Sequence, residues 1–242
     1  MIEGFRGLPL YLKDYAAFKK QMRNNKVFTK FNFHPIFGNR FQQGGIVSGH
    51  YFHQDLYMAT KIYHAKPVHH LDIGSRTDGF IAHLAVFREV EVMDIRPISN
   101  GVTNVNFIQA DLTSDSFPLI NYTYSISCLH AIEHFGLGRY GDNINANGYL
   151  IGLENIYKCL KKDGIFYFST PIGVSRIEFN AHRVFSMKYL LDLFKDKYRI
   201  ISFSYVDDRG NLLSDAILTE ENIESNFGCN YGCGLFELKK IG

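Results

Sequence analysis

Short apolar runs that end in acidic or turn residues alternate along the chain with longer segments of helical periodicity. The runs predict strands over residues 68–72, 90–94, 105–109, 124–128 and 165–170. Helical spacing predicts helices over 54–63, 80–87 and 147–162, and Ser186 can cap a further helix. This alternation is typical of an α/β fold with a mostly parallel sheet, to which strands at 199–206 and 235–239 are added.

The N-terminal segment has a different pattern. Residues 10–23 have helical spacing, whereas residues 32–49 are rich in glycine and aromatic residues and predict irregular chain. We expect residues 1–65 to form a cap or lid and residues 66–242 an α/β domain, together one globular unit. The helix 54–63 leads into the first strand, so its start should lie near that strand's carboxyl end. Tyr51, His53 and Gln54 are therefore candidate substrate-binding residues; the alternative is an aromatic cluster that packs a small helical cap.

The stretch 68–80, VHHLDIGSRTDGF, is a buried strand that passes through a glycine-containing turn into a helix. Such a junction is where α/β sheets bind nucleotides. A dinucleotide fingerprint needs glycines in the first, third and sixth places of this turn. Gly74 and Gly79 fill the first and sixth, but Arg76 fills the third, where a pyrophosphate needs space. The pattern therefore disfavours a nicotinamide-dependent oxidoreductase.

A second strand ends in Asp94, 22 residues after Asp72 (94 − 72 = 22). A carboxylate about 20 residues past the glycine turn is placed to accept hydrogen bonds from both ribose hydroxyls. The third strand is followed by Asp111, which has two interpretations. It is either part of the same nucleotide site or a cap for the turn at residues 113–116.

The densest group of ionisable side chains follows the fourth strand, in the run LHAIEHFGLGRYGD. His130 or His134 could act as a general base with Glu133 orienting it, because a histidine pKa lies near neutrality. The letters HAIEH also fit the HxxEH pattern of inverzincin proteases. That zinc motif needs a long helix, whereas this run leaves a strand and soon reaches glycines. The remaining interpretation is that the histidines only cap and pack the following loop.

A polar segment after the fifth strand supplies a second set of candidates. Asn180 and Arg183 are candidate acceptor-binding residues in a predicted loop, and His182 is a rival for the base. The alternative is a polar loop held by its own hydrogen bonds.

Composition narrows the class of protein. Of the 242 residues, 46% are hydrophobic and 21% charged, which indicates a sizeable core. The net charge is only +2, so we expect no nucleic-acid partner. No window approaches the ~20 apolar residues of a membrane span, so we expect a cytoplasmic protein. The four cysteines form no paired CxxC motifs, so we expect reduced thiols. Cys128 and Cys159 lie in apolar runs and should fill the core.

The spacing DIGSRTDG resembles the first motif of class I S-adenosylmethionine-dependent methyltransferases, and the likeness extends from about residue 50 to 205. The words GHYFHQDL, LDIGSRTDGF, MDIRP, SCLHAIEHFGLGRYGD and FSTPIG look more narrowly like an uncharacterised bacterial methyltransferase-like family associated with surface-polysaccharide genes. The resemblance implies a Rossmann-like class I methyltransferase fold, with a mostly parallel seven-stranded sheet, helices on both faces and an N-terminal helical or irregular cap.

The resemblance also implies a cofactor, S-adenosyl-L-methionine, and the residues that hold it: Asp72, Gly74, Ser75, Arg76, Gly79, Asp94, Ile95, Asp111, Leu112 and Leu129. It implies O-methylation of a small-molecule acceptor, a sugar or nucleotide-activated sugar, with catalytic residues among His130, Glu133, His134 and His182. Arg76 departs from the glycine that many members carry. The sequence leaves a divalent metal undecided, and a non-catalytic binding protein in a glycan-biosynthesis assembly is the alternative function.

Overall fold

The computed structural model describes residues 2–30, 32–37, 39–41, 44–98, 101–114 and 116–242. The chain divides into two compact units, Met1–Val47 and Ser48–Gly242. The boundary lies before the helix that was predicted over 54–63, so this helix belongs with the sheet and not with the N-terminal segment. Within the described residues, no helix combines the length and apolar character needed to cross a bilayer.

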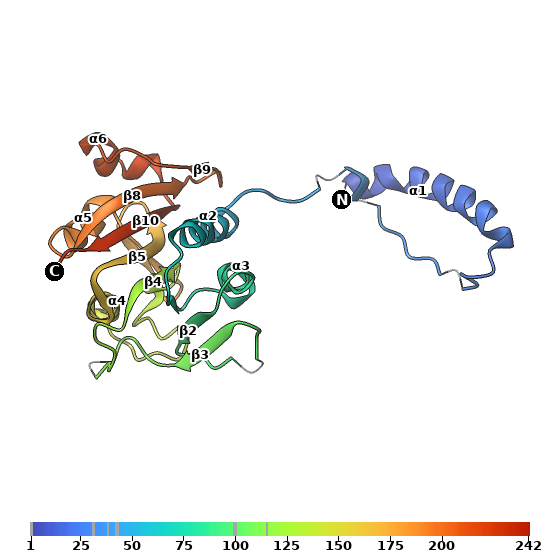
Figure 1. Ribbon diagram of the computed structural model, residues 1–242. Coiled ribbons are helices and arrows are strands. Elements are labelled where there is room, and N and C mark those ends of the chain that lie inside the picture. The colour runs from blue at the N-terminus through green and yellow to red at the C-terminus, as the bar shows by residue number, and fades with distance from the viewer. Residues whose placement is uncertain (1, 31, 38, 42–43, 99–100, 115) are drawn as a thin grey trace. The chain divides into compact units, whose positions relative to one another are not determined.

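The first unit contains α1 (Ile2–Gln21) and the 3-10 turns Met22–Asn24 and Asn39–Phe41. The helix starts earlier than the predicted residue 10, and much of the chain after it is irregular, as predicted (Figure 1). Its aromatic residues pack edge to face: the Tyr11 ring lies 5.4 Å from the rings of Phe33 and Phe37.

The second unit is built on an eight-stranded sheet of order β3-β2-β1-β4-β5-β10-β8-β9. Its strands are β1 (Leu71–Ile73), β2 (Val90–Asp94), β3 (Val105–Gln109), β4 (Thr123–Leu129), β5 (Leu160–Ile172), β8 (Tyr198–Val206), β9 (Leu212–Leu213) and β10 (Gly232–Lys240). β1 to β5 pair in parallel, whereas β10 runs antiparallel to both β5 and β8. The predicted Rossmann-like, mostly parallel sheet is confirmed, and the two-residue strand β9 adds an eighth member at the edge.

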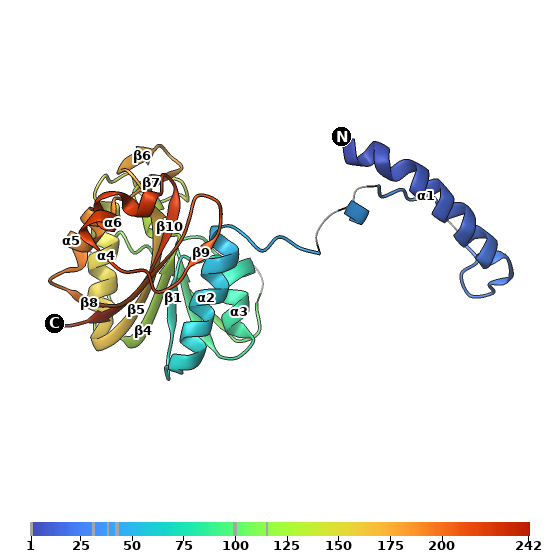
Figure 2. The same cartoon turned by 90° about the horizontal axis from the view of Figure 1, so that it is seen from above.

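Helices cover both faces of this sheet, as predicted (Figure 2). α2 (His50–Ala65) and α3 (Ala82–Ala85) pack on one face, and α4 (Gly148–Cys159) and α5 (Met187–Phe194) on the other. A short α6 (Glu220–Glu224) and a 3-10 turn (Asn226–Gly228) connect β9 to β10.

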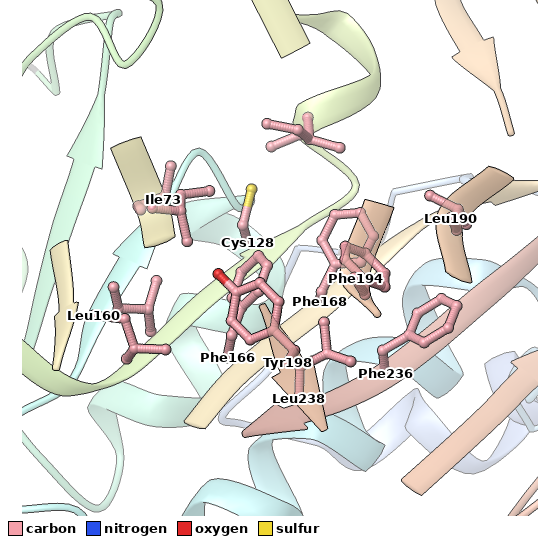
Figure 3. Close-up of a cluster of buried hydrophobic side chains, with 14 of the residues drawn as sticks. Ile73, Cys128, Leu160, Phe166, Phe168, Leu190, Phe194, Tyr198, Phe236 and Leu238 are labelled. Atoms are coloured by element: carbon pink, nitrogen blue, oxygen red, sulfur yellow. The ribbon is translucent and has the colours of Figure 1, made fainter. Parts of the chain in front are cut away.

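Alternation along the central strands divides the core into two layers. In β5, Phe166 and Phe168 join the cluster under α4 and α5, while Tyr167 between them joins the cluster under α2 and α3. In β10, Phe236 lies in the cluster under α4 and α5, and Leu235 lies in the cluster under α2 and α3. Figure 3 shows the first layer, where aromatic rings from β5, α5, β8 and β10 gather. The four cysteines are buried, and none of them is paired in a disulfide with another described residue.

Three predicted elements differ from the structure. The helix predicted over 147–162 ends at Cys159, because the chain turns extended at Leu160 and pairs with β4. The helix predicted over 80–87 is a π-helical turn (Thr77–Ile81) followed by the four residues of α3. The loop predicted around Asn180 is instead a hairpin of β6 (Arg176–Glu178) and β7 (His182–Val184), in which Glu178 pairs with His182.

Candidate functional site

A cavity of about 600 Å³ lies at the carboxyl ends of β1, β2, β3 and β4. Such edges of open α/β sheets are where ligands bind, and the volume is that of a small-molecule site. Four strand ends contribute most of its wall: Ile73, Gly74, Ser75, Arg76, Thr77 and Asp78 after β1; Met93, Asp94, Ile95, Arg96, Pro97 and Ile98 at β2; Ala110, Asp111, Leu112 and Thr113 after β3; His130, Ala131, His134 and Phe135 after β4. Tyr51, Arg139, Tyr140 and Asp142 complete it.

The turn after β1 is held by a buried carboxylate. Asp72 is fully buried and accepts hydrogen bonds from the backbone NH of Ser75 at 3.0 Å, from Ser75 Oγ at 2.7 Å and from Ser127 Oγ at 2.5 Å. Burial raises the pKa of Asp72 to about 7, although these hydrogen bonds oppose the shift. Asp72 does not line the cavity; it shapes the turn that presents Gly74, Ser75 and Arg76 to it.

Gly74 needs its glycine for two reasons. Its φ is +69°, a left-handed conformation, and a Cβ would lie 3.0 Å from the Cβ of Ala131. Gly79 allows α2 to approach closely, because a Cβ at this position would lie 2.5 Å from Oδ2 of Asp55 on α2. Neither Gly79 nor Leu129 lines the cavity.

Asp94 projects into the cavity wall from the end of β2. Arg96 donates to both of its carboxylate oxygens, from Nε at 3.0 Å and from Nη2 at 2.7 Å, and the Arg96 backbone NH donates to Oδ1 at 2.8 Å. The Arg96 guanidinium lies 4.2 Å from the centre of the Tyr140 ring. The carboxylate is thus oriented by its neighbour two residues on.

The side chain of Arg76 is drawn out of the turn. It donates to Asp78 from Nε at 3.0 Å and Nη2 at 2.8 Å, and its guanidinium lies 5.0 Å from the Tyr51 ring centre. Its side chain is 55% exposed. Arg76 therefore forms part of the cavity rim together with Tyr51.

Asp111 lies in the cavity wall, next to Leu112 in the chain. Its Oδ1 accepts from the backbone NH of Thr113 at 2.8 Å and from Thr113 Oγ1 at 2.7 Å. The two interpretations of this residue are therefore compatible, because the side chain caps its own turn and also lines the cavity.

Two histidines of the cavity wall, His130 and His134, lie near a buried glutamate. Glu133 is 1% exposed and does not reach the lining, but its Oε1 lies 2.7 Å from His130 Nδ1 and 3.9 Å from His134 Nε2. Glu133 and His134 lie on a 3-10 turn (Ile132–His134) and His130 precedes it, so the run does not form the long helix that a zinc protease motif requires.

His134 has a defined orientation. Its Nδ1 lies 2.7 Å from the carbonyl oxygen of Ala181, which also accepts from Arg139 Nη1 at 2.8 Å. Nδ1 must therefore carry the proton, which leaves the Nε2 lone pair free. Burial lowers the pKa of His134, outweighing the nearby Glu133 carboxylate, so the imidazole is neutral at pH 7.

Arg183 lies away from the cavity. It is 4% exposed and donates to the backbone oxygens of Glu133 at 3.3 Å, Phe135 at 2.7 Å and Ala146 at 3.2 Å. The guanidinium thus fixes the loop that carries His134.

Of the predicted acceptor residues, only Tyr51 lines this cavity. His53, Gln54 and Asn180 lie outside the lining, and so does His182. Gln54 is buried and accepts from Ser169 Oγ at 2.5 Å, and His53 packs its ring against Phe52. Asn180 is exposed at the tip of the β6–β7 hairpin, and the His182 ring lies 5.1 Å from that of Tyr231.

Sequence reasoning missed the wall formed by Phe135, Arg139 and Tyr140. The Tyr140 ring lies edge to face with His134 at 5.3 Å and 5.1 Å from the Arg139 guanidinium. The sequence feature that could have identified them is their position in the run LHAIEHFGLGRYGD, which also contains His130 and His134. Asp142 holds this loop by accepting from the backbone NH of Gly136 at 2.7 Å.

No curated protein matches the chain. Solved structures do: a S-adenosylmethionine-dependent methyltransferase from Clostridium acetobutylicum (TM-score 0.52, 12% identity, 80% of this chain and 93% of that one) and the N-methyltransferase NodS from Bradyrhizobium japonicum, solved with S-adenosyl-L-homocysteine (0.51, 11%, 93% and 97%). The [4+2]-cyclase SpnF also matches (0.52, 10%, 77% and 82%). At these identities the likeness establishes the class I methyltransferase fold alone.

One family model matches, over residues 90–227, which is more than half of the chain. Its description names Caenorhabditis, not bacteria, and does not mention surface polysaccharides. The matched region runs from β2 to the turn before β10 and contains Asp94, Asp111 and the histidine cluster. The chain belongs to the family described as Caenorhabditis protein of unknown function, DUF268.

Proposed function

We propose that the protein is an S-adenosylmethionine-dependent methyltransferase. The observation that carries this proposal is the cavity of about 600 Å³, whose wall brings Gly74, Asp94 and Asp111 from three successive strand ends to one place. Neighbours of the same fold include methyltransferases, one of them solved with S-adenosyl-L-homocysteine. The fold alone does not decide the reaction, since a cyclase shares it.

We assign the cofactor residues by their place in the wall. The backbone of the Gly74 turn approaches the methionine moiety, and Asp94 accepts from the two ribose hydroxyls. Ile95 and Leu112 flank the adenine, with Asp111 near its amino group. The Arg96 backbone NH, Nε and Nη2 already use three of the four lone-pair positions of the Asp94 carboxylate, so one hydroxyl binds at the free position of Oδ2 and the second replaces a donor of the Arg96 guanidinium.

S-adenosylmethionine, when bound, supplies a sulfonium methyl group for in-line transfer. For a hydroxyl acceptor the protein must hold the oxygen in line and accept its proton. His134 is our candidate for this base, since its Nε2 is unprotonated, its pKa is lowered and it lines the cavity. A neutral histidine at pH 7 can accept the proton directly.

The acceptor proposed here is a sugar or a nucleotide-activated sugar. The rim that remains for it carries the rings of Tyr51 and Tyr140, which contact the guanidiniums of Arg76, Arg96 and Arg139, and the Arg139 side chain is exposed. Aromatic rings pack on the apolar faces of sugar rings, and an arginine pairs with a phosphate. Both features suit a hydroxyl-rich, anionic small molecule.

Calorimetric titration with S-adenosyl-L-homocysteine, and separately with NADH, tests the cofactor. We expect micromolar binding of the first and none of the second. Binding of NADH alone would replace the proposal with a nicotinamide-dependent oxidoreductase. Binding of neither would favour a non-catalytic protein that keeps the fold as a binding partner in glycan biosynthesis.

A further inference from the structure

A second group of chemically reactive side chains includes His130. It brings together His50, the first residue of α2, His130 after β4 and Cys233 on β10. Each offers one ligand atom, and these atoms lie within 4.8 Å of one another. Neither His50 nor Cys233 lines the cavity described above.

His130 carries the clearest sign of a missing partner. Its side chain is 4% exposed, and its Nδ1 is taken by Glu133 at 2.7 Å. Its other nitrogen, Nε2, is buried and has no hydrogen-bond partner among the described residues. A buried nitrogen without a hydrogen-bond partner destabilises the fold, so this position favours a bound ligand. Burial lowers the pKa of His130, but Cys233 and Glu133 raise it well above its ordinary value, so a metal ion would displace the proton from Nε2 while Nδ1 keeps its bond to Glu133.

His50 is held in a similar way. Its ring stacks on the ring of His130, with 5.3 Å between centroids, and on that of Tyr231 at the same distance. It also has a backbone hydrogen bond with Tyr231. Histidines that bind metals commonly donate one ring nitrogen to a carboxylate or a backbone carbonyl, which orients the other toward the ion. His130 has a carboxylate partner in Glu133, and His50 has a backbone partner in Tyr231.

Cys233 supplies the third atom. The residue is fully buried, and its Sγ lies 3.7 Å from Gln54 Oε1 and 3.9 Å from the carbonyl oxygen of Gly234, while its side chain also contacts that of His130. These are weak interactions for a thiol and leave the sulfur available.

We propose that His50, His130 and Cys233 bind a zinc-class transition metal ion through two imidazole nitrogens and one thiolate. Zinc takes such nitrogen and sulfur ligands at about 2.0–2.3 Å in tetrahedral geometry, which places ligand atoms roughly 3.3–3.8 Å apart. Small side-chain rotations bring atoms within 4.8 Å to this spacing. Water fills the fourth position.

A competing interpretation is a nucleophilic Cys233 activated by His130 and Glu133. A nucleophile must reach its substrate, and Cys233 is fully buried outside the cavity lining. A metal ligand needs no such access, and only the metal site uses His50.

The proposed ion joins the start of α2 to β10 and to the turn after β4. It fixes His130 and, through the His130–Glu133 bond, the carboxylate behind His134. This site does not depend on the proposed methyltransferase activity, because its ligands differ from the cofactor and base residues.

The test begins with the full chain purified without a metal-affinity tag. Elemental analysis should find close to one zinc per chain. Replacement of zinc by cobalt(II) should give the visible bands of a tetrahedral site and a near-ultraviolet band from thiolate-to-cobalt charge transfer. Cys233→Ser should remove that ultraviolet band and weaken zinc binding more than about 100-fold, beyond the 10–100-fold effects of outer residues.

His50→Ala gives a second variant at a less buried position, so that a folding failure of Cys233→Ser does not decide the outcome. Glu133→Gln should weaken zinc about 10–100-fold, as expected for a residue that orients a ligand. His64→Ala, at the exposed end of α2, and Cys229→Ser, outside the cluster, should bind zinc as the wild type does.

Three results would overturn the site: no zinc or cobalt uptake by the folded wild type, uptake that survives both His50→Ala and Cys233→Ser, or cobalt binding without a thiolate band. Rapid alkylation of Cys233 by iodoacetamide in folded, metal-free protein that binds no zinc would point to the nucleophile instead. Binding of S-adenosyl-L-homocysteine is measured separately, so failure of either proposal is distinguished from failure of the other.

Discussion

Arg96 donates to both carboxylate oxygens of Asp94, at 3.0 and 2.7 Å, while its guanidinium lies over the ring of Tyr140 at 4.2 Å. The pair fixes the one acidic side chain at the end of β2 in the cavity wall. In our account the ribose hydroxyls bind to this oriented carboxylate.

Asp94→Ala should weaken S-adenosyl-L-homocysteine binding by at least about 100-fold, because two hydrogen bonds to a charged group are lost at ~1.5–3 kcal/mol each. Arg96→Ala should cost about tenfold or less, since it removes only the orienting partner. Calorimetry measures both variants. Asp163→Ala, an exposed carboxylate paired with Lys239, is the matched control. Wild-type affinity in Asp94→Ala would remove the ribose assignment.

His134 should titrate below its ordinary pKa of about 6.5, because burial disfavours the imidazolium. Its imidazole is therefore neutral above that depressed pKa and protonated only in more acidic solution. Nitrogen-15 NMR at pH 7 should find Nδ1 protonated and Nε2 bare, with His134→Gln identifying the resonances. His64→Ala should leave these signals unchanged. A protonated Nε2 at pH 7 would exclude His134 as the base.

Asp72 should make the protein less stable as the pH rises from about 4 to about 7. Its pKa is 3.8 in the unfolded chain and about 7 in the folded one, so between these values only the folded state binds the proton. Stability from this group is therefore complete below pH 3.8 and lost as the pH passes 7. The shift corresponds to roughly 4 kcal/mol.

Urea unfolding at several pH values measures this dependence. Asp72→Asn, which cannot ionise, should lack this decline, while Asp163→Asn at an exposed carboxyl should keep it. Equal pH slopes in the wild type and Asp72→Asn would contradict the raised pKa.

Arg183→Ala should destabilise the fold by about 2–4 kcal/mol, because it leaves the backbone oxygens of Glu133, Phe135 and Ala146 without their donor. Arg209→Ala, at an exposed arginine, should have little effect. Thermal unfolding compares the two. If Arg183→Ala is as stable as the wild type, the residue is free for another role, such as the acceptor binding that its position in the sequence suggested.

Much of the fold could be predicted because its strands are short apolar runs between turn signals. The predicted ranges 90–94 and 105–109 agree with β2 and β3. The end of α4 was missed, since the lysines and glycine after Cys159 fit a helix end as well as a strand start. Tertiary pairing with β4 decides between them.

The site was harder to predict, because side-chain direction does not follow from position after a strand. Arg183 and Gln54 were placed near the acceptor by their position in the chain, yet both are buried against other segments. Cys233 and His50 meet only through the pairing of β10 with β5 and the packing of α2, so no local pattern links them.

We propose that the cavity at the carboxyl ends of β1–β4 binds S-adenosylmethionine. A crystal structure with S-adenosyl-L-homocysteine tests it most directly. We predict the ribose hydroxyls on the Asp94 carboxylate, the adenine between Ile95 and Leu112, and the sulfur toward His134. A ligand bound elsewhere, or a cavity that stays free of it at saturating concentration, would contradict the account.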